Sequence, residues 1–126
     1  MISAIVIDDD RDTVSIFVDY LEMLNVDVWA VGYDGKQAVD LYRTHGPDMM
    51  FLDMMMPEYD GLYALKEIRR INPDAKVIVV TADMRKDTED RLSLLNPTEV
   101  IYKPFDPVVL KALIEKHGTS KTSITS

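Results

Sequence analysis

Short apolar runs alternate along the chain with segments whose apolar residues recur every three to four positions. The apolar runs cover residues 3–7, 27–31, 49–52, 76–80 and 100–102. The segments with helical spacing cover residues 11–24, 34–45, 64–71, 83–95 and 109–117. Continuous apolar runs of this length are typical of strands buried on both faces, as in a parallel sheet. The alternation therefore predicts a doubly wound α/β fold, with a five-stranded parallel sheet and helices on both faces.

Cap and turn residues refine these boundaries. Asp34, followed three residues later by Gln37, resembles a capping box and predicts the start of the second helix. Asp10 or Asp12 is expected to cap the first helix, where a carboxylate also favours the helix dipole. Asn96 precedes a proline, which disfavours helical backbone and predicts an extended conformation there.

The two histidines lie at predicted helix ends and are not linked by any spacing typical of a metal site. We therefore expect His45 and His117 to be solvated.

Length and composition limit the possible functions. The chain has 126 residues, which fit one domain at residues 1–117 followed by a polar, flexible tail at residues 118–126. The sequence contains no cysteine, which excludes disulfides, thiolate zinc sites and cysteine nucleophiles. No apolar run approaches the ~20 residues that span a bilayer, so we expect a cytoplasmic protein. The net charge of -8 argues against nucleic acid and anionic membranes as direct partners, because both repel an acidic surface.

Polar side chains follow four of the five apolar runs. Asp8 and Asp9 follow the first run, and Asp53 follows the third. Thr81 and Lys103 follow the fourth and fifth runs. The carboxyl ends of parallel strands share one edge of a sheet, and open α/β sheets bind ligands at that edge. These side chains form one site if their strands are neighbours.

Several carboxylates at one edge require a cation. Two carboxylates about 5 Å apart repel by ~3 kcal/mol at an effective dielectric constant near 20. Carboxylates, a backbone carbonyl and water suit Mg²⁺. Formation of an aspartyl phosphate requires four groups together: an aspartate, a nearby Mg²⁺, a lysine and a hydroxyl. The carboxylate attacks phosphorus, while the positive charges neutralise the oxygens of the transferring group.

Taken together, these motifs resemble the receiver domain of response regulators in two-component signalling, in its stand-alone, CheY-like form. The motifs are Asp8-Asp9, Asp53 with Met56-Pro57 and Gly61, Thr81-Ala82, and Lys103-Pro104-Phe105. The resemblance extends from Ser3 to about Lys116. It implies a flavodoxin-like strand order of 2-1-3-4-5.

The resemblance also assigns roles at the predicted metal site. Asp53 accepts the phosphoryl group from the phosphohistidine of a sensor histidine kinase or phosphotransfer protein. Asp9 binds Mg²⁺ directly, Asp8 binds it largely through water, and Asp53 and the backbone carbonyl of Met55 complete the protein ligands. By the same resemblance, the protein is a phosphoacceptor switch that catalyses only its own phosphorylation and dephosphorylation.

Two further residues act on the phosphoryl group in receivers. The resemblance implies that Lys103 contacts it and that Thr81 moves in to donate a hydrogen bond to it. In this family the peptide bond between Lys103 and Pro104 is often cis.

The family's output is a surface formed by the fourth helix, fifth strand and fifth helix, here residues 83–95, 100–102 and 109–117. Because the sequence shows no effector domain, we expect a downstream protein to bind this surface, unless the chain is part of something longer. The aromatic residue that usually reports the switch is replaced by Val100. That replacement leaves open a receiver-shaped binding module that signals without phosphorylation.

Two other classes fit the sequence less well. Mg²⁺ phosphatases of the haloacid-dehalogenase type need an acid two residues after the nucleophile, where this chain has Met55. Flavin-binding proteins of the same fold have a hydroxyl-rich phosphate loop after the first strand. This chain has three aspartates there, residues 8–10, which would repel a phosphate.

Overall fold

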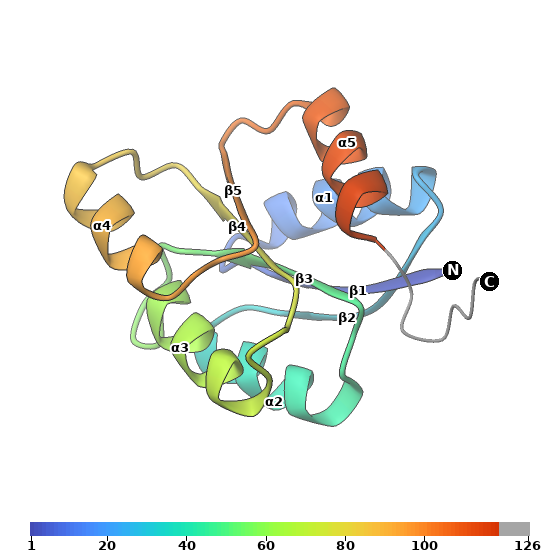
Figure 1. Ribbon diagram of the computed structural model, residues 1–126. Coiled ribbons are helices and arrows are strands. Elements are labelled where there is room, and N and C mark those ends of the chain that lie inside the picture. Colours follow the sequence, from blue (N-terminus) through green and yellow to red (C-terminus); the bar gives the residue numbers. More distant parts are fainter. Residues whose placement is uncertain (119–126) are drawn as a thin grey trace.

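The computed structural model describes residues 1–118, in which strands and helices alternate from end to end (Figure 1). The strands are β1 (Ile2–Ile7), β2 (Val26–Gly32), β3 (Met49–Asp53), β4 (Val77–Thr81) and β5 (Glu99–Tyr102). The helices are α1 (Arg11–Met23), α2 (Gly35–His45), α3 (Gly61–Ile71), α4 (Lys86–Leu94) and α5 (Pro107–His117). The predicted tail lies outside the described residues except for Gly118.

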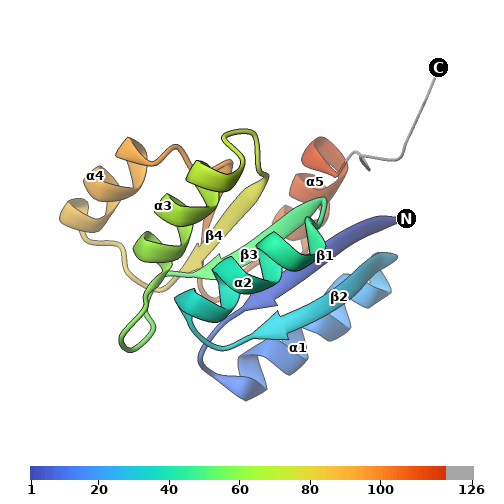
Figure 2. The ribbon, with the colours of Figure 1, turned by 90° about the horizontal axis from the view of Figure 1, so that it is seen from below.

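All neighbouring strands are parallel, and their order across the sheet is β2-β1-β3-β4-β5, as predicted (Figure 2). The first strand therefore lies between β2 and β3, and the order reverses direction at β1. This reversal opens a crevice at the carboxyl ends of the strands, where ligands bind in folds of this kind.

Helices cover both faces of the sheet in two layers (Figure 1). Successive residues of a strand point to opposite faces, so β3 contributes to both cores. Met49 and Phe51 pack with α1 and α5, whereas Met50 and Leu52 pack with α2, α3 and α4. All five residues of β3 are buried, which explains its continuous apolar sequence.

Four of the five helices begin at an aspartate whose carboxylate accepts a backbone N–H of the first turn. These N-caps are Asp10, Asp34, Asp60 and Asp106. The predicted caps at Asp10 and Asp34 are thus confirmed. Gln37 differs from an ideal capping box, because its Oε1 accepts the N–H of Tyr33 at 2.9 Å instead of that of the cap residue.

The fourth helix begins at Lys86, three residues later than the predicted start at residue 83. Asp83 does not enter the helix, because its carboxylate accepts the N–H of Arg85 at 3.0 Å. Short polar side chains that bond a backbone N–H two residues ahead compete with helix formation in this way.

The expectation of an extended Asn96 is wrong, since its φ of 50° lies in the left-handed region. Asparagine tolerates this conformation better than most residues. The carbonyl of Asn96 also accepts hydrogen bonds from Nε and Nη2 of Arg69, at 3.2 and 2.7 Å. These two bonds from α3 outweigh the bias that the following proline imposes.

His117 is not solvated as expected, whereas His45 is exposed. The Nε2 atom of His117 lies 2.7 Å from Oε2 of Glu99, at the start of β5. This contact fastens the end of α5 to the sheet, and the hydrogen bond from His117 lowers the pKa of Glu99.

Candidate functional site

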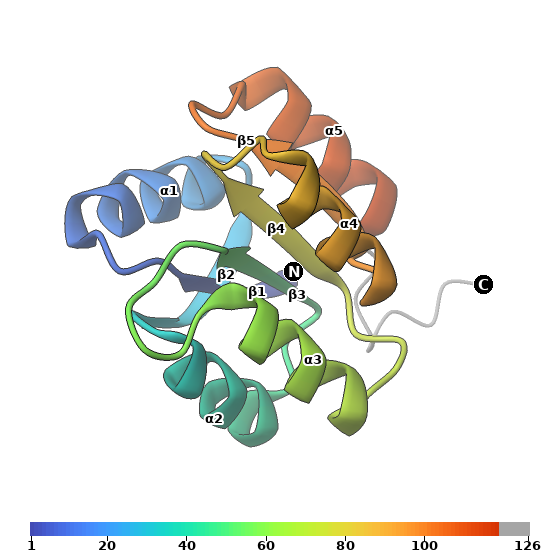
Figure 3. The ribbon, with the colours of Figure 1, turned by 90° about the vertical axis from the view of Figure 1, so that its left-hand side faces the viewer.

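The loops that follow β1, β3, β4 and β5 meet at one edge of the sheet, the side that faces the viewer in Figure 3. Asp53 is the last residue of β3, and its neighbour in β4 is Val80. Thr81 ends β4 and Lys103 follows β5, and the N–H of Lys103 donates to the carbonyl of Thr81 at 2.9 Å. The structure therefore brings the predicted strand-end residues to one place.

Three carboxylates lie together in this crevice. Each of Asp8, Asp9 and Asp53 offers an oxygen atom, and the three oxygens lie within 4.8 Å of one another. Asp8 and Asp53 are 5% and 4% exposed, whereas Asp9 is open to solvent. Hard divalent cations such as Mg²⁺ prefer oxygen donors and keep part of their hydration, so a half-open cluster of this kind fits such an ion.

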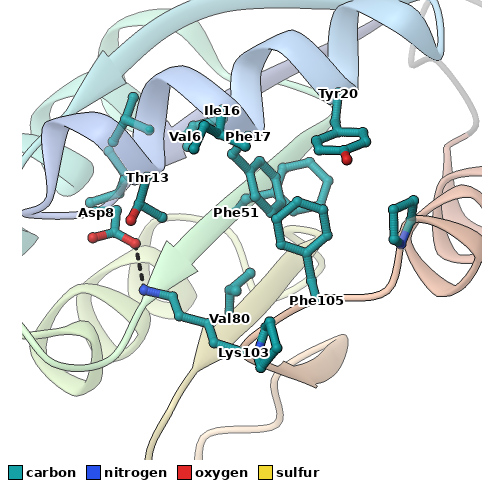
Figure 4. A pocket seen from close by; sticks show the side chains of 14 residues that line it. Val6, Asp8, Thr13, Ile16, Phe17, Tyr20, Phe51, Val80, Lys103 and Phe105 are labelled. Atoms are coloured by element: carbon teal, nitrogen blue, oxygen red, sulfur yellow. Dashed lines mark hydrogen bonds and ion pairs between the residues drawn. The ribbon is translucent and has the colours of Figure 1, made fainter.

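Lys103 supplies the positive charge among these residues. Its Nζ donates to Oδ2 of Asp8 at 2.7 Å (Figure 4) and lies 3.5 Å from Oδ1 of Asp53. Burial disfavours the charged lysine, but the hydrogen bond to Asp8 and the charge of Asp53 outweigh burial and raise its pKa. The peptide bond to Pro104 is cis, as the resemblance implied.

The pKa of Asp53 is raised in this cluster. Burial and the nearby charge of Asp8 raise that pKa from 3.8 to about 6, although Lys103 and the N–H of Met55 act in the opposite direction. Three carboxylates face one ammonium, so the ionised cluster carries an excess of negative charge. A divalent cation bound to these carboxylate oxygens would neutralise this excess negative charge.

Thr81 is fully buried at the end of β4. Its Oγ1 accepts the backbone N–H of Asp83 at 2.9 Å. The hydroxyl is the acceptor in this bond, so the bond does not use its hydrogen. Thr81 thus retains the donor that contact with a phosphoryl oxygen requires.

In the loop from β4 to α4, Asp83 is held by a hydrogen-bond network with Arg85 and Thr88 that was not predicted from the sequence. The carboxylate of Asp83 accepts hydrogen bonds from Nε and Nη2 of Arg85 at 2.9 and 2.6 Å, and from the hydroxyl of Thr88 at 2.7 Å. The hydrogen bonds from Arg85 and Thr88 hold the pKa of Asp83 well below its ordinary value. An aspartate followed two residues later by an arginine was the available sequence signal. This hydrogen-bond network fixes the position of Asp83, whose backbone N–H donates to the hydroxyl of Thr81.

The loop from β3 to α3 covers another side of the crevice. Met54 and Met56 are buried, whereas Met55 is 55% exposed. Of these three methionines, only Met54 and Met56 therefore act as apolar cover beside the crevice. The carbonyl of Met54 accepts the N–H of Gly61 at 3.2 Å, which closes the loop.

The raised pKa of Asp53 leads to a prediction about stability. The folded state holds this proton more tightly than the unfolded state, so the stabilisation is complete below pH 3.8 and is lost as pH rises through about 6. The full difference corresponds to about 3 kcal/mol, and screening at this open edge reduces it. We expect Asp53→Asn to raise the free energy of unfolding by about 1–2 kcal/mol at pH 7.5 in a metal chelator.

Urea unfolding of both proteins at pH 7.5 and pH 3.5 measures this difference. The advantage of the variant should disappear at the lower pH, where Asp53 is protonated. Asp19→Asn, at an exposed position on α1, is the matched control and should change little at either pH. Equal stability of the native protein and Asp53→Asn at both pH values would contradict the prediction.

Comparison with known proteins agrees with the fold described above. The sequence model of the response regulator receiver domain matches residues 4–115. The chain belongs to this family, which acts in two-component signalling, and the resemblance seen in the sequence is thereby confirmed.

No helix within residues 1–118 has both the length and the apolar character needed to cross a bilayer.

Two chemotaxis proteins are among its relatives. The chain is 33% identical to the chemotaxis protein CheY of Bacillus subtilis over 101 residues, covering 80% of this chain and 84% of that protein. It is 30% identical to CheY of Thermotoga maritima over 103 residues, covering 82% and 86%.

A solved structure shares the fold. A chain of the CheX-CheY-BeF3-Mg²⁺ complex from Borrelia burgdorferi superposes with a TM-score of 0.84 at 24% identity, covering 91% of this chain and 88% of that one.

Proposed function

We propose that this receiver accepts a phosphoryl group on Asp53 and that phosphorylation switches a protein-binding surface. The donor is the phosphohistidine of a sensor histidine kinase or phosphotransfer protein. One observation carries the proposal: a buried carboxylate at a strand end lies beside two more carboxylates and the ammonium of Lys103. The Borrelia burgdorferi complex that shares the fold contains BeF3 and Mg²⁺, which supports the binding of an anion and a metal by proteins of this fold.

Mg²⁺ would be held by Asp8, Asp9, Asp53 and the backbone carbonyl of Met55. When bound, the ion supplies positive charge that stabilises the oxygens of the transferring group. Asp8 already accepts the N–H of Asp10 at 3.0 Å, which fixes the orientation of its carboxylate. The fit rests on the oxygen donors and the excess negative charge described above.

The transfer forms one bond and breaks another. A carboxylate oxygen of Asp53 bonds to phosphorus while the bond from phosphorus to the imidazole nitrogen breaks, and the imidazole leaves with the bonding electrons and takes up a proton. Lys103 stabilises the charge on the phosphoryl oxygens, because its ammonium already lies 3.5 Å from Asp53. Thr81 then donates its hydroxyl hydrogen to one of these oxygens.

The output surface comprises α4, β5 and α5. Exposed apolar side chains on two of these elements suit a protein partner: Leu94 is 82% exposed and Val108 is 75% exposed.

Val100 is only partly buried and packs against the core under α2, α3 and α4. Tyr102, whose partner in β4 is Thr81, contacts Oε1 of Glu89 through its hydroxyl at 3.2 Å. It thus links the strand end to α4.

The test is the intact mass of the protein after incubation with acetyl phosphate, with and without Mg²⁺. We expect one phosphoryl adduct that requires Mg²⁺ and is absent from Asp53→Asn. Asp10→Asn is the matched control, because it removes the same charge from the helix cap next to the site and should still take up phosphate.

If neither acetyl phosphate nor a phosphohistidine donor gives an adduct, the phosphoacceptor function is excluded. The receiver-shaped binding module, which the absence of an aromatic residue at Val100 favours, would then replace it.

A further inference from the structure

A pocket of about 340 Å³ lies between α1 and the loop that joins β5 to α5 (Figure 4). It extends from Asp8 and Lys103 at one end to the aromatic side chains of Phe105 and Tyr20 at the other. Its volume falls at the lower end of the range typical of small-molecule sites. The phosphorylation chemistry proposed above uses only the polar end, so the apolar part of the pocket has no assigned role.

Aromatic rings form the apolar part of the pocket and hold one another in place. The ring of Phe17 lies 5.1 Å from that of Phe51 and 4.9 Å from that of Phe105, between centroids. Tyr20 meets Phe105 edge to face at 5.4 Å. Edge-to-face and tilted pairs at these distances are favourable. The pocket is therefore preformed and suits a flat apolar body.

The polar end favours a cation over an anion. Asp8 accepts one hydrogen bond from Lys103 and one from the N–H of Asp10. An ionised carboxylate has about four acceptor positions, so Asp8 retains capacity for another donor. Asp8 and Lys103 both line this end and pair with each other, whereas Asp9 and Asp53 lie beside the pocket without lining it. Their two carboxylates leave an excess of negative charge near this end, and the whole chain carries a net charge of -8. Without a bound metal ion, an anionic ligand would meet repulsion at this end.

We propose that this pocket binds small amphipathic amines. The apolar body lies against Phe17, Phe51 and Phe105, and the ammonium group donates to Asp8. This binding needs the folded pocket and the carboxylate, and it does not depend on phosphorylation of Asp53. The receiver thus has a ligand site next to its phosphorylation site, and the two share Asp8.

Three probes with the same apolar body test the charge assignment: 3-phenylpropylamine, 3-phenylpropan-1-ol and 3-phenylpropanoate. Each is titrated into the native protein in a metal chelator at low salt and followed by two-dimensional NMR of the backbone amides. We expect a dissociation constant of about 1 mM for the amine, as is usual for a ligand of this size. The alcohol should bind about tenfold more weakly, since it lacks the charge-assisted bond, and the carboxylate more weakly still. Equal affinity for amine and alcohol, or stronger binding of the carboxylate, would overturn the proposal.

A pair of substitutions on α1 tests the location. Ile16 lines the pocket and is 55% exposed, so Ile16→Trp can block the pocket without disturbing the core. Met23 is 75% exposed on the same helix and does not line the pocket, which makes Met23→Trp the matched control. Binding of the amine should fall at least tenfold in Ile16→Trp and stay unchanged in Met23→Trp. Undiminished binding to Ile16→Trp would place the amine elsewhere and refute the site, whatever the outcome of the phosphorylation test.

Discussion

Replacing Lys103 with methionine should change Mg²⁺ affinity and phosphoryl uptake in opposite directions. Methionine keeps much of the length of the side chain and removes only the ammonium, which lies 2.7 Å from Asp8 and 3.5 Å from Asp53. A charge of +1 repels a divalent ion about 5 Å away by roughly 1.7 kcal/mol even at the dielectric constant of water. We therefore expect Lys103→Met to bind Mg²⁺ about tenfold more tightly.

Phosphoryl uptake should fall although the metal binds better. The transferring group develops charge on its oxygens, and a preorganised cation at that position typically contributes a factor of about 10²–10³ in rate. The initial rate of adduct formation with acetyl phosphate at saturating Mg²⁺ should therefore fall about 100-fold or more. Calorimetric titration with Mg²⁺ and intact mass over time give the two quantities on the same preparation.

Lys116→Met is the matched control for this experiment. Lys116, on α5, is 69% exposed in its side chain and pairs with Glu99 at 3.4 Å. Glu99 is the first residue of β5, at the opposite end of that strand from the crevice. Lys116→Met should change neither quantity. Weaker Mg²⁺ binding in Lys103→Met, or uptake within about threefold of the native rate, would contradict the role assigned to the ammonium.

The residues of the site were predictable because strand ends are visible in the sequence. Apolar runs stop at Asp8 and Asp53, and the parallel fold places such ends at one edge. Thr81 and Lys103 followed from the same pattern. The strand order, however, came from the family resemblance, since alternation of strands and helices does not by itself determine which strands are neighbours.

Contacts set by loop shape could not be predicted in this way. Asp83 stays outside α4 because Arg85 and Thr88 bond its carboxylate. Asn96 is held in the left-handed region by Arg69, which lies 27 residues earlier in the chain. Local preferences pointed to a longer helix and an extended asparagine, and in both cases side-chain hydrogen bonds that depend on the assembled fold prevailed.

The loop beside Asp53 contains a glycine whose replacement should have a large effect on stability. Gly61 is the first residue of α3, and its N–H donates to the carbonyl of Met54 at 3.2 Å. A Cβ at this position would meet the carbonyl oxygen of Asp53, as well as Cα of Met54 at 2.8 Å. These are backbone atoms at the end of β3, which cannot rotate away as a flexible side chain does.

Gly61→Ala should therefore lower the free energy of unfolding by about 2–3 kcal/mol, the upper part of the range typical of overpacking, because the crowded atoms are backbone. The strain falls on the strand end that carries Asp53, so phosphoryl uptake should also slow, by about tenfold, in the fraction that remains folded. Urea unfolding and the initial rate of adduct formation measure these two effects.

Gly46→Ala separates crowding from backbone strain. Gly46 ends α2 with a φ of 51°, and a Cβ there would meet nothing within 4 Å. Alanine at this position costs only the left-handed conformation, about 1 kcal/mol, and should leave phosphoryl uptake unchanged because it is remote from the crevice. Equal losses of stability in the two variants, or normal uptake in Gly61→Ala, would show that the end of β3 can yield. The close approach of Gly61 would then not be what holds Asp53 in place.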